Sequence, residues 1–205
     1  MEKPIIFSTP MVRAILEGKK TQTRRVIKPQ PSNGIRKSVF VKSGLEDGHG
    51  REIKIPYQPG DVLWVRETWA DLRGMGFDRP FAYLTDSWNS KYGEEDGDSK
   101  RCRLDYGVKW KPSIHMPKSA ARIWLEVVNV RAERLQDILC GDMKREGCIP
   151  ATVTGGQWQQ WQRDYWIPLW DSLNAKRGYG WDTNPWVWVV AFEKISKEEA
   201  ERLKA

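Results

Sequence analysis

The chain is poor in the residues that build disulfides and metal sites. Its 205 residues hold three cysteines and two histidines. No two cysteines form a Cys-x-x-Cys pair, and the histidines are far apart in sequence, so the pattern predicts neither a disulfide framework nor a zinc site. We therefore expect a cytoplasmic protein with no cofactor and no metal. The residues concerned are Cys102, Cys140, Cys148, His49 and His115.

Long apolar runs are also lacking. No stretch of 18 apolar residues occurs, so we expect no membrane span. Charged residues come directly after Met1, without an apolar core segment, so we expect no signal peptide. The sequence also shows no glycine-rich phosphate loop, no nucleophile elbow and no metal triad. A function must therefore come from dispersed residues that the fold brings together.

What the chain does have is positive charge and tryptophan. The formal net charge is +7, charged residues make up 30% and hydrophobic residues 40%. This balance is that of an ordinary globular protein. The charge permits a polyanionic partner such as RNA or DNA, and a solvated basic surface is the alternative. Length predicts one domain over 1–205. The oligomeric state is not predicted by the sequence.

The first third of the chain alternates strand and helix signals. Thr9-Pro10 resembles a helix start, and Gly18 is a natural stop. Residues 32–58 contain two alternating pieces, which predict a hairpin insertion around Gly44–Gly50. The expected elements are a strand at 4–7, a helix from Thr9, strands at 21–27, 37–42 and 51–57, and a strand at 62–67.

The rest of the chain is less regular until residue 122. Pro168 lies inside the helical pattern of 157–174 and should kink or split that helix. Tryptophans at helical spacing there predict core packing. The other expected elements are strands at 81–84 and 122–132, an extended segment at 110–117, short helices at 135–139 and 142–147, a strand at 186–195, and a helix capped by Ser196.

Three motifs concentrate the chemistry: GKKTQTRR at 18–25, GDVLWVRE at 60–67 and IWLEVV at 123–128. The third is the most informative, because Glu126 stands in an apolar strand where an unpaired carboxylate is costly to desolvate. Glu126 therefore needs a cationic or donor partner, and the first motif offers Lys20 and Arg25. We expect Lys20, Thr23 and Glu126 to line one concave pocket.

The order of these motifs, followed by the late strand WVWVVAF, resembles the ASCH (activating signal cointegrator homology) family. The signature G-x-K-x-x-T-x-R over 18–25 is similar to that of the family, with threonine where many members carry glutamate. The resemblance implies an α+β fold, a PUA-like β-barrel flanked by helices, with insertions at 32–58 and 71–118. It covers nearly the whole chain. The larger form resembles phage and prophage members, which implies the host cytoplasm.

Threonine at position 23 resembles the bacterial subgroup that hydrolyses N4-acetylcytidine to cytidine and acetate. The resemblance implies catalytic roles for Lys20 as general base, Thr23 as nucleophile or hydroxyl donor, and Glu126 as the group that orients Lys20. Positions 20 and 23 fall on opposite faces of an ideal strand, so they converge only if Lys20 belongs to the loop after Gly18.

Four further residues are candidates for substrate binding. Arg25 offers a planar fork for a phosphate or a base edge. Trp64 lies beside a motif strand and suits base stacking. Glu67 is a second candidate acid, and Thr21 completes the set. The leading expectation is a protein that binds a modified nucleoside or RNA and deacylates N4-acetylcytidine-type nucleosides.

Three alternatives remain open. A non-catalytic RNA- or DNA-binding module fits the net charge and the tryptophans equally well. A metal-independent ribonuclease is an activity that the wider resemblance also implies. A phage assembly protein or a host-takeover protein with a decayed site is the last. Structural ion pairs and core packing also explain each candidate residue, and sequence does not separate them from a site.

Overall fold

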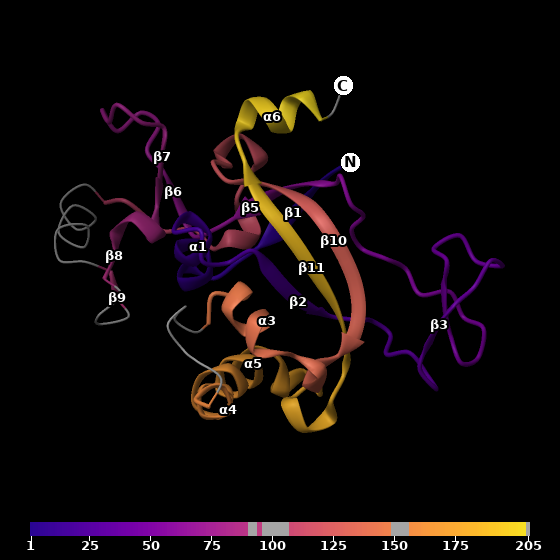
Figure 1. Ribbon diagram of the computed structural model, residues 1–205. Coiled ribbons are helices and arrows are strands. Elements are labelled where there is room, and N and C mark those ends of the chain that lie inside the picture. Colours follow the sequence, from indigo (N-terminus) through magenta and orange to yellow (C-terminus); the bar gives the residue numbers. More distant parts are fainter. Residues whose placement is uncertain (90–93, 96–106, 149–155, 204–205) are drawn as a thin grey trace. The chain divides into compact units, whose positions relative to one another are not determined.

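The computed structural model describes residues 1–89, 94–95, 107–148 and 156–203. It confirms the α+β class, and the PUA-like barrel stays a prediction. Five strands form a mixed sheet, shown in Figure 1. Their order is β1 (Glu2–Ile6), β5 (Val62–Arg66), β10 (Trp124–Arg134), β11 (Trp186–Ile195) and β2 (Gln22–Val26).

The chain divides into two compact units. Unit 1 comprises Met1–Gly18, Asp61–Glu126 and Lys194–Ala205, and unit 2 comprises Lys19–Gly60 and Val127–Glu193. Strands β10 and β11 contribute residues to both units. The expected single domain with insertions at 32–58 and 71–118 stays a prediction, and part of the second insertion lies outside the described residues.

In unit 1, β1 runs parallel to β5, and the start of β10 runs antiparallel to it with Trp124 opposite Trp64. Leu63 and Val65 are buried on the opposite face of β5 from Trp64, as strand alternation predicts. The other elements are α1 (Thr9–Leu16), β6 (Trp69–Asp71), β7 (Phe81–Tyr83), η1 (Leu84–Ser87), β8 (Trp88–Asn89), β9 (Glu94–Glu95), η2 (Ser113–His115), η3 (Lys118–Ala120) and α6 (Lys197–Arg202).

In unit 2, β11 runs antiparallel to β2, and helical segments enclose an apolar cluster that includes Met143, Trp166 and Trp170. Burying side chains of this size contributes about 1.5–3 kcal/mol each. The other elements are β3 (Ile35–Lys37), β4 (Leu45–Asp47), η4 (Leu135–Asp137), α3 (Cys140–Arg145), α4 (Trp158–Trp161), the π-helix η5 (Gln162–Trp166), α5 (Ile167–Asn174), η6 (Ala175–Arg177) and η7 (Trp181–Thr183).

Several expected element ends are confirmed, each by a local signal. Helix α1 has Pro10 in its first turn and is followed by Gly18 at φ 71°. Pro168 lies in the first turn of α5, but the helical backbone continues without a gap from α4 through the π-helix into α5, so the chain is not split there and the expected kink stays a prediction. Ser196 caps α6 in a capping box with Glu199.

Two expectations were wrong. The hairpin pairs Ile35 with Asp47 and turns over Ser38–Gly44, so 37–42 and 51–57 are not its strands. Gly44 takes φ 74° in that turn, and the Asp47 carboxylate accepts from the His49 and Arg51 amides, which bends the chain away after β4. The segment 110–117 is not fully extended, because Pro112 starts the 3₁₀ turn η2.

Candidate functional site

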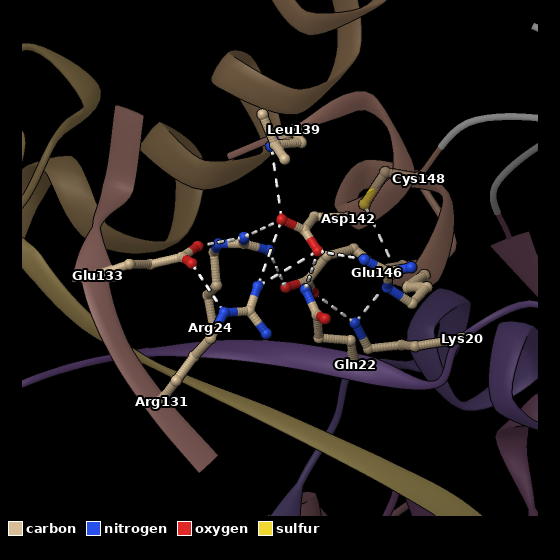
Figure 2. A network of polar contacts seen from close by, with 10 residues as sticks. Lys20, Gln22, Arg24, Arg131, Glu133, Leu139, Asp142, Glu146 and Cys148 are labelled. Carbon is tan, nitrogen blue, oxygen red and sulfur yellow. Dashed lines mark hydrogen bonds and ion pairs between the residues drawn. The ribbon is translucent and has the colours of Figure 1, made fainter. Parts of the chain in front are cut away.

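The candidate site begins on one face of β2 in unit 2. Strand alternation directs Lys20, Gln22 and Arg24 to the same side, toward α3 and the turn that follows it. Lys20 precedes β2 and makes an isolated bridge with Glu146. Figure 2 shows these side chains converging on Asp142 and Glu146. A strand and a short helix thus bury a charged network.

Lys20 is fully buried within this network. Its side chain is 0% exposed, and the ammonium donates to the Glu146 Oε2 at 2.8 Å and to the Glu146 carbonyl at 3.0 Å. A buried charge of this kind is tolerated only when paired and hydrogen-bonded. If Lys20 served as a base toward a ligand, these hydrogen bonds would have to be rearranged.

Arg24 is equally enclosed and links three carboxylates. Its Nη1 donates to Glu146 Oε1 at 3.0 Å, and its Nη2 donates to Asp142 Oδ2 at 3.2 Å and to Glu133. The guanidinium also lies 5.9 Å from the ring centroid of Trp166. Arg24 Nε has no hydrogen-bond partner among the described residues. Arg24 therefore links the three carboxylates from the buried side of the network.

Asp142 is the hub where the buried network meets the surface. It accepts hydrogen bonds from Gln22 and Arg24 on the buried side and from Arg131 and Arg145 on the exposed side. Burial by itself raises the pKa of Asp142, but the Arg145 hydrogen bond and the charges of Arg24 and Arg131 outweigh it, and the pKa falls to about 2. Asp142 is therefore ionised at neutral pH.

An open cavity of about 400 Å³ adjoins this hub. Arg131 and Arg145 line it with side chains that are 40% and 54% exposed. Arg131 Nη1, Arg145 Nε and Arg145 Nη1 have no hydrogen-bond acceptor among the described residues. The remaining lining residues are Thr21, Gln22, Val128, Asn129, Ala191, Phe192 and Glu193. Two guanidinium groups that retain unused donors therefore line a space of ligand size.

The predicted residues of the first motif separate within unit 2. Thr21 lines the cavity, while Lys20 lies in the buried network. Thr23 is 4% exposed and falls on the opposite face of β2 from Gln22 and Arg24. Arg25 shares that opposite face, and its burial lowers its pKa, against the raising effects of Tyr57 and Glu146. The structure does not bring Thr23 into the Lys20 network.

The other predicted residues belong to unit 1. Glu126 lies at the start of β10 opposite Val62, and Trp64 lies on β5 packed with Val62 and Trp124. Glu67 is 1% exposed just after β5. The expected convergence of Glu126 with Lys20 and Thr23 stays a prediction, because these residues fall in different units.

Glu67 is the centre of a second charged cluster. Arg122 donates to it through Nε at 2.9 Å and Nη2 at 3.1 Å, and the Thr85 hydroxyl donates at 2.8 Å. The third Arg122 nitrogen donates to Asp86, and the guanidinium lies 3.9 Å from the ring centroid of Tyr83. Burial raises the pKa of Tyr83. All donor nitrogens of Arg122 are thus engaged inside unit 1.

Sequence reasoning missed Asp142, Glu146, Arg131 and Arg145. The i,i+3 spacing of Asp142 and Arg145 was a readable signal of a helix-surface ion pair. Glu146 stands at the end of the predicted helix at 142–147, yet nothing in the sequence pointed it at Lys20. The pairs Lys20–Glu146 and Arg24–Asp142 each join residues more than a hundred positions apart, and neither pair carries a local sequence signature.

Cys148 lies beside Glu146 of the buried network. Burial, with the Glu146 carboxylate, raises the pKa of the Cys148 thiol to about 12, so Cys148 is not a thiolate at neutral pH. No group of three histidine, cysteine or acidic side chains among residues 1–89, 94–95, 107–148 and 156–203 is placed to hold a metal ion. Cys102 lies outside the described residues.

No protein-family model, no curated protein and no solved structure matches the chain. Within the described ranges, no helix has both the length and the apolar character needed to cross a membrane.

Proposed function

We propose that unit 2 binds RNA or a phosphorylated modified nucleoside in the cavity beside Asp142. The observation that supports this is the pair of arginines, Arg131 and Arg145, which share Asp142, line the cavity and retain unused N–H groups. Guanidinium forks match the geometry of phosphate oxygens. The same cavity carries neutral polar side chains, Thr21 and Asn129, suited to a base edge.

The buried part of the network has a positioning role in this proposal. Four cations, Lys20, Arg24, Arg131 and Arg145, meet three carboxylates, Glu133, Asp142 and Glu146. Glu193 adds a fourth acidic side chain at the cavity wall, so the proposal rests on the unused guanidinium donors and not on net charge. Asp142 fixes both exposed guanidinium groups through its oxygens, and Lys20 and Arg24 hold the carboxylates in place. A fixed pair of arginines loses less side-chain freedom when an anion binds.

The test is an RNA titration with a charge-matched control. Fluorescence anisotropy of a labelled single-stranded RNA is followed over a salt series for wild type and Arg131→Ala/Arg145→Ala. The double variant should lower the salt slope by about 1.4, since each single-strand phosphate contact contributes about 0.7. The control Arg73→Ala/Lys197→Ala removes two exposed charges of unit 1 and should change the slope less.

Two results would count against the proposal. One is a wild-type protein that binds neither the RNA nor a nucleoside monophosphate at low salt. The other is a control variant that loses as much affinity as the cavity variant, which would mean that net charge alone drives binding. The variant Arg131→Lys/Arg145→Lys retains the charge and loses the fork, so it should bind with intermediate affinity.

A second candidate is the deacylation of N4-acetylcytidine by Lys20, Thr23 and Glu126, as the ASCH resemblance implies. The observation in its favour is a buried lysine held against a carboxylate, Lys20 with Glu146, near Thr21 in the cavity wall. Acetate release from N4-acetylcytidine tests it, with Lys20→Ala, Thr23→Val and Glu126→Gln as variants. A wild type that releases no acetate would exclude this candidate.

We further propose that the chain belongs to the ASCH family, forms a PUA-like barrel and lies in the cytoplasm, that of the host if the chain is encoded by a phage. These proposals rest on the motif order and on the dispersed cysteines.

A further inference from the structure

Two apolar side chains stand at the tip of the β3–β4 hairpin of unit 2. Val39 and Phe40 are each 92% exposed. Both lie in the turn Ser38–Gly44 between the two short strands. In Figure 1 the hairpin extends away from α3, α4 and α5 of the same unit. Two adjacent apolar residues at this position leave an aromatic ring almost fully in water.

The tip has a defined backbone. The Ser38 amide donates to the Gly44 carbonyl at 2.9 Å, and the Gly44 amide donates to Val41 at 3.1 Å. The Phe40 amide donates to the Ser38 hydroxyl at 3.2 Å, and the Ser43 amide donates to Glu52 at 2.7 Å. These bonds close the turn on itself, so the ring of Phe40 is presented outward on a supported loop.

Charges along the hairpin divide by position. At its base, Arg36 donates to Glu46 at 2.8 Å, and Arg51 pairs with Asp47 at 2.7 Å. Beside the tip, Lys37 and Lys42 are exposed and have no ion pair or hydrogen bond from their side chains within the described ranges. The tip therefore combines an exposed ring with two cations that form no ion pair among the described residues.

We infer that this tip is a contact for single-stranded RNA, in which Phe40 stacks on a base and Lys37 and Lys42 approach the flanking phosphates. The inference rests on the proposed function, because it adds a second contact in the unit that carries the cavity. Aromatic rings beside cations are the usual platform for unpaired bases. Charge complementarity favours RNA over a protein partner, and two side chains cover far less than the roughly 800 Å² per partner of a stable protein interface.

The test uses RNA that carries 2-aminopurine, whose fluorescence reports stacking. Binding of wild type should change this signal at one or more positions of the probe. Phe40→Ala should abolish that change and raise Kd by about 5- to 150-fold. Phe40→Tyr should restore both, and Phe40→Leu should restore neither, because leucine is apolar without a π face. Lys37→Ala/Lys42→Ala should lower the salt slope by about 1.4.

Failure of the inference and failure of the proposed function are separable. If wild type binds RNA and Phe40→Ala leaves Kd and the 2-aminopurine signal unchanged, the tip is not a base contact and the cavity proposal stands. If Phe40→Ala removes all RNA binding while Arg131→Ala/Arg145→Ala retains it, the tip inference stands and the cavity proposal fails.

Two parallel measurements test the other partners that an apolar tip could contact, a membrane and a second copy of the chain. Co-sedimentation with phosphatidylcholine–phosphatidylglycerol vesicles that is lost in Phe40→Ala, without an effect on RNA, would mean a membrane contact and would overturn the inference. Sedimentation equilibrium that shows a dimer dependent on Phe40, again without an effect on RNA, would mean self-association and would overturn it too. Each variant is first checked for an unchanged unfolding midpoint.

Discussion

Both units bury a carboxylate with arginine, but they use the arginine differently. In unit 1, all three nitrogens of Arg122 donate hydrogen bonds to Glu67 or Asp86, and its guanidinium plane lies over the ring of Tyr83. In unit 2, Arg131 and Arg145 hold Asp142 by one edge and retain donors toward a cavity. The first cluster is closed on itself, whereas the second is open to a ligand. Burial of charge alone does not single out a candidate site, whereas unused donors beside a cavity do.

The largest expected effect separates the two clusters by stability. Glu146→Gln leaves Lys20 and Arg24, both with side chains 0% exposed, without their shared anion. Breaking a buried pair costs about 3–5 kcal/mol. Glu67→Gln should cost less, about 1–3 kcal/mol, because Arg122 is 27% exposed and can reach water. Urea unfolding measures both, and equal losses would break the comparison.

The two clusters should also differ in RNA binding, which should depend on the cluster of unit 2 and not on that of unit 1. Arg131→Ala/Arg145→Ala should weaken RNA binding about tenfold to a hundredfold, since each arginine loses a hydrogen bond whose net contribution at a solvent-exposed site is about 0.5–1.5 kcal/mol. Arg122→Ala should leave RNA affinity within about twofold and lower the unfolding midpoint instead, because its donors are already engaged. Anisotropy and urea unfolding on the same preparations supply the two readouts. RNA affinity that follows Arg122 instead would contradict the assignment.

Hydroxyl deletions sharpen the comparison further. Thr85→Val removes a 2.8 Å hydrogen bond to Glu67 and should cost about 1–2 kcal/mol of unfolding free energy. Thr21→Val, at the cavity wall of unit 2, should change stability by under about 0.5 kcal/mol and weaken nucleotide binding. If Thr21→Val destabilises the protein as much as Thr85→Val, Thr21 is structural.

The smallest effect is the acid sensitivity of the open cluster. The folded-state pKa of Asp142, about 2, lies below its ordinary 3.8, so its contribution is fully present above about pH 4 and is lost as pH falls through 2. Screening at the cavity edge limits this contribution to about 1 kcal/mol. Asp142→Asn should flatten the stability profile in this window. If Asp142→Asn loses stability at low pH in the same way as wild type, other carboxylates are responsible for that loss.

Local signals predicted much of the fold. Gly18 and the Ser196 capping box each mark an element end that the structure confirms, because each acts through its immediate neighbours. The strand at 186–195 was predictable from its length and apolar run. The hairpin strands were misplaced, because its register depends on Gly44 and on the Asp47 side chain rather than on alternation.

Of the candidate site, only the part beside β2 was predictable from the sequence. Lys20 was singled out as a partner for Glu126, and in the structure its ammonium pairs with Glu146, on the turn after α3, which the sequence did not indicate. The sequence shows which charges are costly to bury, and long-range packing decides which of them meet. Arg131 and Arg145 were missed because each looks like a surface charge until Asp142 joins them.

The most direct test observes the guanidinium groups themselves. The ¹⁵Nε resonances of Arg131, Arg145 and Arg122 are assigned through their Lys variants and followed as single-stranded RNA is added. The open-cluster account predicts shifts at Arg131 and Arg145 with Arg122 unchanged. RNA binding that shifts Arg122, or that leaves Arg131 and Arg145 unmoved, would contradict the account.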